Sequence, residues 1–163
     1  MNADYLKSLI LTLTDQSSED FVGFPDSTLE AANNWAGIFE KYMNGDISKG
    51  DMFIPGSDTI SLGIDALRGN LALIVDGNGE AMFISGLVAM ATAIAPGIST
   101  HSSGAFTGVP PFGSPLLSPI FTQGSQNLLT VEEIAEKLAN TIDSWMKTGT
   151  YINNESGATL FWQ

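Results

Sequence analysis

Apolar residues recur every three or four positions along much of the chain, which is the pattern of amphipathic helices. Leu6, Leu9, Ile10 and Leu13 form a narrow apolar stripe of this kind near the N-terminus. Three later segments show the same period, and a fourth is apolar throughout. The pattern predicts a mainly α fold, a bundle of about five helices over residues 5–13, 28–44, 58–75, 81–95 and 130–149.

Two of these helices begin with the sequence of a capping box, in which a hydroxyl and a carboxylate three residues apart exchange hydrogen bonds with backbone N–H groups. The pairs are Ser27 with Glu30 and Thr130 with Glu133. Gly149 stands where a left-handed residue is expected to close the last helix. These ends therefore define the second and last helices most sharply.

Glycines interrupt the third predicted helix at Gly63 and Gly69. A glycine inside a helix costs about 1 kcal/mol relative to alanine. We expect each of them to be either a weak point or a site where another helix comes close. The turn Asp76–Glu80 then joins this helix to the next, and residues 52–54 of the preceding connector are expected to lie extended against the core.

The fourth predicted helix, Ala81–Ala95, is apolar on every side. It lies between Glu80 and Pro96 and has 15 residues, whereas a membrane-spanning helix needs about 20. A helix without a polar face is tolerated when it is surrounded by other elements. We therefore expect a buried core helix at the centre of the fold or of an interface.

A Pro-rich segment follows, which we define as residues 96–121. It contains five of the seven prolines and the only histidine, and it has no charged residue. Because proline lacks a backbone N–H, this composition predicts a long loop, residues 96–129, without helix or sheet hydrogen bonds. Its apolar side chains still need a surface to cover.

The tail, residues 150–163, has β-branched and aromatic residues on both sides of the turn sequence NNESG. This pattern predicts a short hairpin or an extended arm. The chain length fits one domain, residues 1–163. Its predicted parts are an N-terminal helix and acidic loop (1–27), a helical core (28–95), the loop (96–129), the last helix (130–149) and the arm or hairpin (150–163).

Composition excludes several classes of function. The formal net charge is -12, and the six basic residues are scattered singly, which argues against direct nucleic-acid binding. The chain has no cysteine, so it forms neither disulfides nor thiolate metal sites. The N-terminal apolar run has an acid before its lysine and no small-residue cleavage site, so we expect a product made in the cytoplasm without a signal peptide.

Candidate catalytic and metal sites are weak in this sequence. His101 is a single histidine in a Ser- and Gly-containing stretch without a nucleophile motif. Asp76, Asn78 and Glu80 alternate as in a calcium loop, but Ala81 and Leu87 stand where its glycine and its bidentate glutamate are required. We expect no catalytic residue, no metal ion and no cofactor, and therefore a protein that is not an enzyme.

Charge is distributed very unevenly. Residues 81–131 form a run of 51 residues without Asp, Glu, Lys or Arg, so every charge lies outside it. An uncharged, apolar segment of this length needs cover, either from the protein's own helices or from another subunit. The candidate interface residues are Phe106, Phe112, Leu116, Leu117, Ile120, Phe121, Leu160, Phe161 and Trp162.

The order of parts over residues 28–155 resembles small virion structural proteins of tailed bacteriophages. The resemblance lies in the capped helices, the apolar AMFISGLVAMATAIAPG helix, the uncharged VPPFGSPLLSPIF segment and a helix ending in WMKTGT. It implies a repeated subunit of a tail, baseplate or neck that acts through contacts with its neighbours.

The sequence therefore favours a non-enzymatic structural subunit of a virion, made in the host cytoplasm. Its expected partners are copies of itself and other virion proteins, with no sequence-specific nucleic-acid contact and no membrane. Two other functions stay open. One is an all-helical module that binds a small apolar ligand beneath the Pro-rich segment, and the other is a membrane-active lysis factor that uses residues 81–121.

Overall fold

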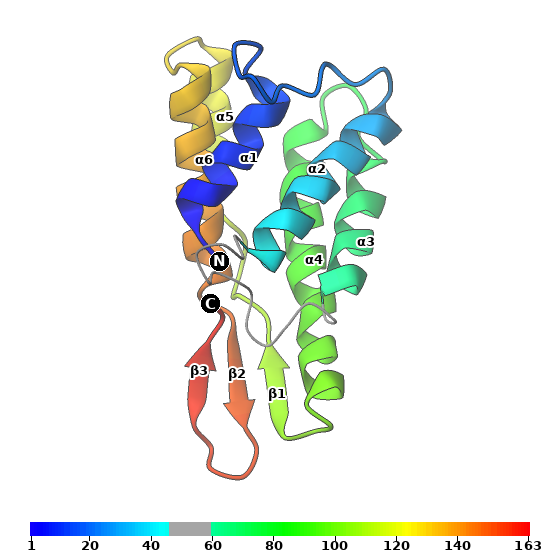
Figure 1. The fold of residues 1–163 in the computed structure, drawn as a ribbon, viewed down its shortest axis with the longest axis vertical. Helices are drawn as coiled ribbons and strands as arrows, with labels where there is room; N and C mark the ends of the chain where they lie inside the picture. The colour runs from blue at the N-terminus through cyan, green and yellow to red at the C-terminus, as the bar shows by residue number, and fades with distance from the viewer. Residues whose placement is uncertain (46–59) are drawn as a thin grey trace.

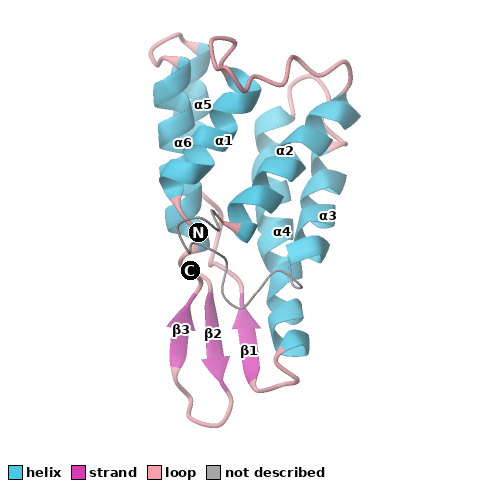
Figure 2. Cartoon of the chain, in the orientation of Figure 1, coloured by secondary structure: helices cyan, strands magenta, loops and turns pink. Residues whose placement is uncertain are grey.

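The computed structural model describes residues 1–45 and 60–163. The predicted extended segment at residues 52–54 and the predicted start of the third helix lie outside the described residues. Within them the chain is mainly α, as the sequence predicts, with six helices and one small antiparallel sheet (Figures 1 and 2). The helices are α1 (Ala3–Thr14), α2 (Thr28–Asn44), α3 (Ile60–Leu71), α4 (Gly79–His101), α5 (Ser118–Ser125) and α6 (Val131–Met146).

The sheet has the strand order β1-β2-β3, with β1 at Phe106–Val109, β2 at Thr150–Asn153 and β3 at Thr159–Phe161. Both strand pairs are antiparallel, and Thr150 lies opposite Val109 on one side and Phe161 on the other. The predicted C-terminal hairpin is therefore confirmed as β2 and β3. The remaining strand of the sheet, β1, comes from the Pro-rich segment.

The helices form two groups above the sheet (Figure 1). One group contains α1, α5 and α6, and the other contains α2, α3 and α4. Within the first group, Lys7 of α1 forms ion pairs with Glu132 and Glu136 of α6, at N–O distances of 2.9 and 3.0 Å, and the hydrogen bond to Glu132 is the main reason that the pKa of Lys7 is raised. β1 packs against the lower part of α4 and attaches the sheet to the second group.

The predicted helix starts of α2 and α6 are confirmed at atomic level. The Ser27 hydroxyl accepts a hydrogen bond from the Glu30 backbone N–H at 3.1 Å. Thr130 and Glu133 form the full reciprocal capping box. Local sequence determines both ends because the capping side chain and the N–H group lie within one turn.

The prediction of an irregular loop over residues 96–129 is wrong in three places. First, α4 continues through Pro96 to His101. A proline inside a helix costs about 3 kcal/mol. Ala95 and Ile98 are buried beside it, and their packing against the rest of the fold offsets that cost.

The other two elements in this segment, β1 and α5, have their prolines at positions where proline is tolerated. β1 ends at Val109, directly before Pro110 and Pro111, so no proline lies in the strand. α5 begins at Ser118 with Pro119 in its first turn. Backbone N–H groups in the first turn have no partner inside the helix, so the missing N–H of a proline costs nothing there. The prolines therefore determine where these elements begin and end.

Two helix ends also differ from the prediction. α3 ends at Leu71 instead of near Val75, because the Asn78 side chain accepts from the Val75 N–H at 2.7 Å and holds a turn there. At the end of α6, Gly149 is not a left-handed cap. Its missing Cβ makes room for the Trp162 indole, whose nearest ring atom lies 2.5 Å from where a Cβ would stand.

Gly63 allows α3 and α4 to pack closely. A Cβ at Gly63 would lie 2.6 Å from Ile94 Cγ1 and 2.9 Å from the Met90 backbone oxygen. Gly69 has no neighbouring atom within 4 Å of the same point. Of the two alternatives expected for each glycine, close helix contact is thus confirmed for Gly63, whereas Gly69 makes no such contact.

The described residues include one helix, Gly79–Ser99 within α4, that is long and apolar enough to cross a membrane by length and composition. Core helices of soluble proteins meet the same criterion. The sequence argument that the apolar run is too short does not hold, because the helix continues past Pro96. In this fold, α4 packs on α3 and β1, with Leu87, Met90 and Ile94 fully buried.

We expect Gly63→Ala to destabilise the fold by about 1–3 kcal/mol, since the new methyl group meets a backbone oxygen that cannot move aside. Gly69→Ala is the matched control, and it should stabilise the fold by about 0.5–1 kcal/mol through helix propensity alone. Urea unfolding followed by circular dichroism measures both. Equal effects of the two substitutions would contradict this packing.

A second prediction concerns acid stability. Hydrogen bonds from the Thr130 backbone N–H and hydroxyl lower the pKa of Glu133 from its ordinary value of 4.5. Because the folded pKa is the lower one, the stabilisation is complete above the unfolded pKa and is lost as the pH falls through the folded pKa. Glu133→Gln should therefore be less stable than the wild type at pH 7 and approach it below pH 4.5. Urea midpoints across this range measure the difference, and a gap between Glu133→Gln and the wild type that does not narrow at acid pH would contradict the prediction.

Candidate functional site

Five of the nine candidate interface residues pack on the protein's own core. Leu117, Ile120 and Trp162 are buried, and Phe106 and Phe121 are half-buried against the same cluster. The Trp162 indole N–H donates to the Thr150 carbonyl oxygen at 3.1 Å, and the Trp162 backbone N–H donates to Gly149 at 2.8 Å. For these five residues the structure shows one of the two alternatives that the sequence left open, which is cover by the protein's own core.

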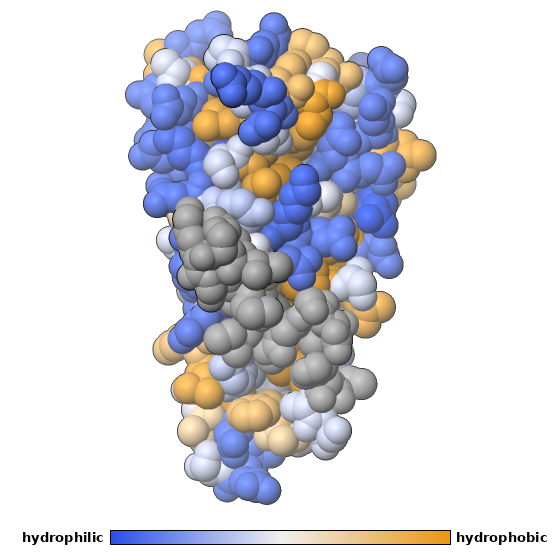
Figure 3. Space-filling view, in the orientation of Figure 1, coloured by the Kyte–Doolittle hydropathy of each residue, from blue (hydrophilic) through white to orange (hydrophobic). Residues whose placement is uncertain are grey.

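The other four candidates remain exposed. Phe112 is 97% exposed and Leu116 is 81% exposed, in the connection between β1 and α5. Leu160 and Phe161, both in β3, are 45% and 59% exposed. Figure 3 shows apolar side chains on the molecular surface at the position of β3. These four side chains are what the structure leaves of the predicted interface.

Within residues 1–45 and 60–163, β3 also has no partner strand on one side of its backbone. Hydrogen bonds from Trp162 N–H to Gly149 and from Asn153 N–H to Ala158 identify the pairs that face β2. Antiparallel ladders alternate, so the N–H and C=O groups of Thr159 and Phe161 point away from β2. Among the described residues, no strand pairs with this outer side of β3.

The opposite edge of the sheet, at β1, is covered. The Gly108 backbone N–H donates to the Ser99 hydroxyl of α4 at 3.2 Å. A Cβ at Gly108 would collide with the Ala95 carbonyl oxygen, so only glycine permits this approach. Of the two edges of the described sheet, α4 closes one, and β3 is the accessible edge.

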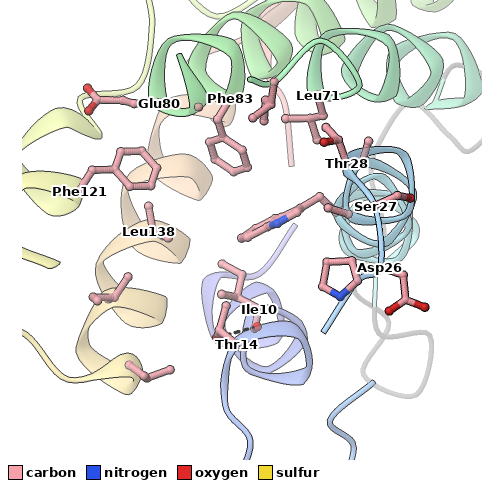
Figure 4. A pocket seen from close by; sticks show the side chains of 18 residues that line it. Ile10, Thr14, Asp26, Ser27, Thr28, Leu71, Glu80, Phe83, Phe121 and Leu138 are labelled. Atoms are coloured by element: carbon pink, nitrogen blue, oxygen red, sulfur yellow. Dashed lines mark hydrogen bonds between the residues drawn. The ribbon is translucent and has the colours of Figure 1, made fainter. Parts of the chain in front are cut away.

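A second candidate site is a cavity of about 700 Å³ between the two helix groups (Figure 4). All six described helices contribute side chains to its wall. Three aromatic rings run across it: Trp35 and Phe83 are 5.0 Å apart between ring centroids, and Phe83 and Phe121 are 6.1 Å apart, both edge-to-face. Periodic spacing of apolar residues in the sequence does not signal a cavity, because the same pattern serves a filled core.

The polar residues of the cavity wall are already bonded or lie at its edge. Thr14 donates to the Ile10 carbonyl oxygen at 3.0 Å, and Ser27 caps α2. Glu80 accepts a hydrogen bond from the Ser118 hydroxyl. Figure 4 shows the carboxylates of Glu80 and Asp26 at opposite edges, turned away from the centre. The interior is therefore apolar and its edge is acidic.

The two helix groups are joined by a buried polar contact at the other end of α2 and α6. The Tyr42 hydroxyl donates to Asp143 Oδ1 at 2.7 Å, and Lys147 Nζ lies 2.8 Å from Asp143 Oδ2. Asp143 is 6% exposed and is the charged residue that the structure buries in the described core. Its carboxylate is fully engaged by structural partners, so we assign it no chemistry.

The remaining sequence candidates do not form a site. The His101 side chain lies outside the described part of the structure. Asn78 is used in the turn before α4, which agrees with the interpretation of Asp76–Glu80 as turn chemistry. Within residues 1–45 and 60–163, no group of three or more His, Cys, Asp or Glu side chains is arranged to hold a metal ion.

Comparison with protein-family models, with curated proteins and with solved structures finds no match for this chain.

The Tyr42–Asp143 contact gives a direct test of how the helix groups are joined. Tyr42→Phe removes a donor from a buried carboxylate and should destabilise the fold by about 1–3 kcal/mol. Tyr151→Phe is the control, since the half-buried Tyr151 hydroxyl makes no hydrogen bond in the described structure. Urea unfolding measures the free energy of unfolding of both variants. Equal values for Tyr42→Phe and Tyr151→Phe would contradict a stabilising contact between Tyr42 and Asp143.

Proposed function

We propose that this protein is a non-enzymatic structural subunit of a bacteriophage virion, and that it contacts copies of itself through the free edge of β3. The observation that carries the proposal is that β3 combines outward-pointing backbone groups at Thr159 and Phe161 with the exposed side chains of Leu160 and Phe161. An exposed strand edge of this kind is a template for pairing with another chain.

The physical gain comes from two sources. Pairing satisfies backbone groups that otherwise bond only to water, and it fixes the register of the contact. Covering the apolar side chains removes their surface from water, which is worth about 1.5–3 kcal/mol for each fully buried side chain. Strand edges that avoid association usually carry lysine, proline or a bulge. Thr159, Leu160 and Phe161 provide none of these.

A contact between two identical β3 edges would be isologous, meaning that the same residues meet from both sides of a twofold axis. It would join two three-stranded sheets into one continuous sheet. Because β3 is three residues long, each contact is small. Strength in a virion would then come from many simultaneous contacts, including those of exposed Phe112 and Leu116.

The virion setting of the proposal comes from the resemblance in the order of parts over residues 28–155. The acidic composition is compatible with a particle that holds DNA, since a net charge of -12 repels the phosphate backbone. The Pro-rich segment now supports the proposal less than the sequence suggested, because Leu117 and Ile120 cover the protein's own helices.

The test changes the edge and leaves the hairpin intact. Thr159→Pro removes an N–H that points outward, so the bonds to β2 remain while pairing with another chain is blocked. Phe161→Lys places a charge on the same edge. We expect both variants to lower the molar mass measured by light scattering over a concentration series, with an unchanged far-ultraviolet circular dichroism spectrum.

Leu62→Lys is the matched control, because Leu62 is 60% exposed on α3 and lies outside the sheet. It should assemble as the wild type does. A wild-type protein that stays monomeric at every concentration would refute self-association through β3. Assembly that is unchanged in both edge variants would refute it equally.

A further inference from the structure

The cavity between the two helix groups has the size and the wall of a ligand site. Its volume of about 700 Å³ falls inside the range of roughly 300–1,000 Å³ that is typical of sites for small organic molecules. We propose that it binds a small amphiphile with an apolar body and a neutral or cationic head group. This site is separate from the β3 edge, so the inference does not depend on the proposed function.

The apolar body is favoured by the side chains that form the wall. Phe83 and Phe121 point into the cavity in Figure 4, and Ile10, Leu71 and Leu138 surround them. These side chains come from five different helices, so they present a concave apolar surface instead of a single flat face. An alkyl or aromatic group placed there removes apolar surface from water.

Trp35 adds a specific polar contact. Its indole ring is half-buried in the wall, edge-to-face with Phe83. The indole N–H has no hydrogen bond to another described residue, and it is not among the buried atoms without a partner, so it is open to water or to a ligand. The polar end of a tryptophan usually finds an acceptor. A hydroxyl, carbonyl or ether oxygen on the ligand would supply that acceptor. The ligand is therefore an amphiphile and not a pure hydrocarbon.

The edge of the cavity selects the charge of the head group. Asp26 and Glu80 lie there, and among the described residues that line the cavity there is no lysine, arginine or histidine. The whole chain carries a formal charge of -12. A carboxylate or phosphate head group would enter against this field without a basic partner, whereas an ammonium group would be attracted and a hydroxyl group would be neutral.

The cavity lies at the end of the helix groups that is not joined by Tyr42 and Asp143. Its lining residues come from the first half of α2 and α6, whereas Tyr42 and Asp143 lie in the last turns of these helices. A fixed contact at one end holds the helices at a set distance, and the cavity persists at the other end. A ligand therefore enters a site that is largely formed in advance.

The experiment compares three ligands that share one alkyl chain and differ in the head group: decylamine, 1-decanol and decanoate. Isothermal titration calorimetry at pH 7, below the concentrations at which they form micelles, measures each affinity on the full chain. We expect decylamine and decanol to bind and decanoate to bind at least about tenfold more weakly. Shortening the chain to octyl should weaken binding by about fourfold per methylene.

Two substitutions fill the cavity from different helices. Ala31→Phe projects from α2 and Val131→Phe from α6, and both residues line the wall. We expect each to abolish binding of decylamine while the protein stays folded by circular dichroism. Ala81→Phe is the matched control, because Ala81 is exposed on α4 and does not line the cavity. It should bind as the wild type does.

Removal of the two carboxylates at the edge of the cavity tests the head-group preference separately. Asp26→Asn combined with Glu80→Gln should reduce the preference for decylamine over decanoate by about threefold to tenfold. The control removes two exposed carboxylates elsewhere, by Glu40→Gln with Glu155→Gln. It has the same net charge and should keep the wild-type preference.

Three results would overturn the inference: no binding by decylamine or decanol, binding of decanoate with equal affinity, or full binding by both cavity-filling variants. Failure of all three ligands would mean that the cavity does not bind a small amphiphile. Because the edge variants Thr159→Pro and Phe161→Lys leave the cavity untouched, they should bind decylamine normally. Failure of self-association and failure of ligand binding are thus distinguishable.

Discussion

The hydrogen bond between Tyr42 and Asp143 is the contact on which the arrangement of the helices depends. A buried carboxylate is costly unless it is paired, and here Tyr42 and Lys147 occupy both of its oxygens. Their positions fix α2 against α6 at one end. At the other end, Trp35 of α2 and Phe83 of α4 pack edge-to-face in the wall of the cavity. One group of helices is therefore joined to the other with a cavity between them.

The sheet is positioned by a different kind of contact, in which a glycine without a Cβ lets another part of the chain come close to its backbone. Gly108 lets β1 lie against α4, and Gly149 lets the Trp162 ring lie over the end of α6. Together they fix the two outer parts of the sheet to the helices. Because Trp162 is buried, the residues before it in β3 cannot leave the sheet. Leu160 and Phe161 are thereby held at an edge where water surrounds them.

The two proposed sites use opposite properties of one molecule. The β3 edge is exposed, apolar and strand-like, which suits repeated pairing with identical chains. The cavity is lined by helices and bordered by Asp26 and Glu80, which suits a small ligand with a neutral or cationic head. The two sites lie at different places along the same helix, because β1 meets α4 at Ala95 and Ile98, whereas Glu80 and Phe83 of α4 line the cavity.

Local chemistry in the sequence determined the helical class, the caps at Ser27 and Thr130 and the C-terminal hairpin, because each of these depends on residues within a few positions of one another. The path of the chain through Pro96 was decided only by the tertiary structure, since buried Ile98 compensates for a helix-breaking residue. The same holds for the candidate site. Phe112 and Leu117 look alike in sequence, yet one is exposed and the other is buried, because side-chain exposure depends on which distant elements the chain meets.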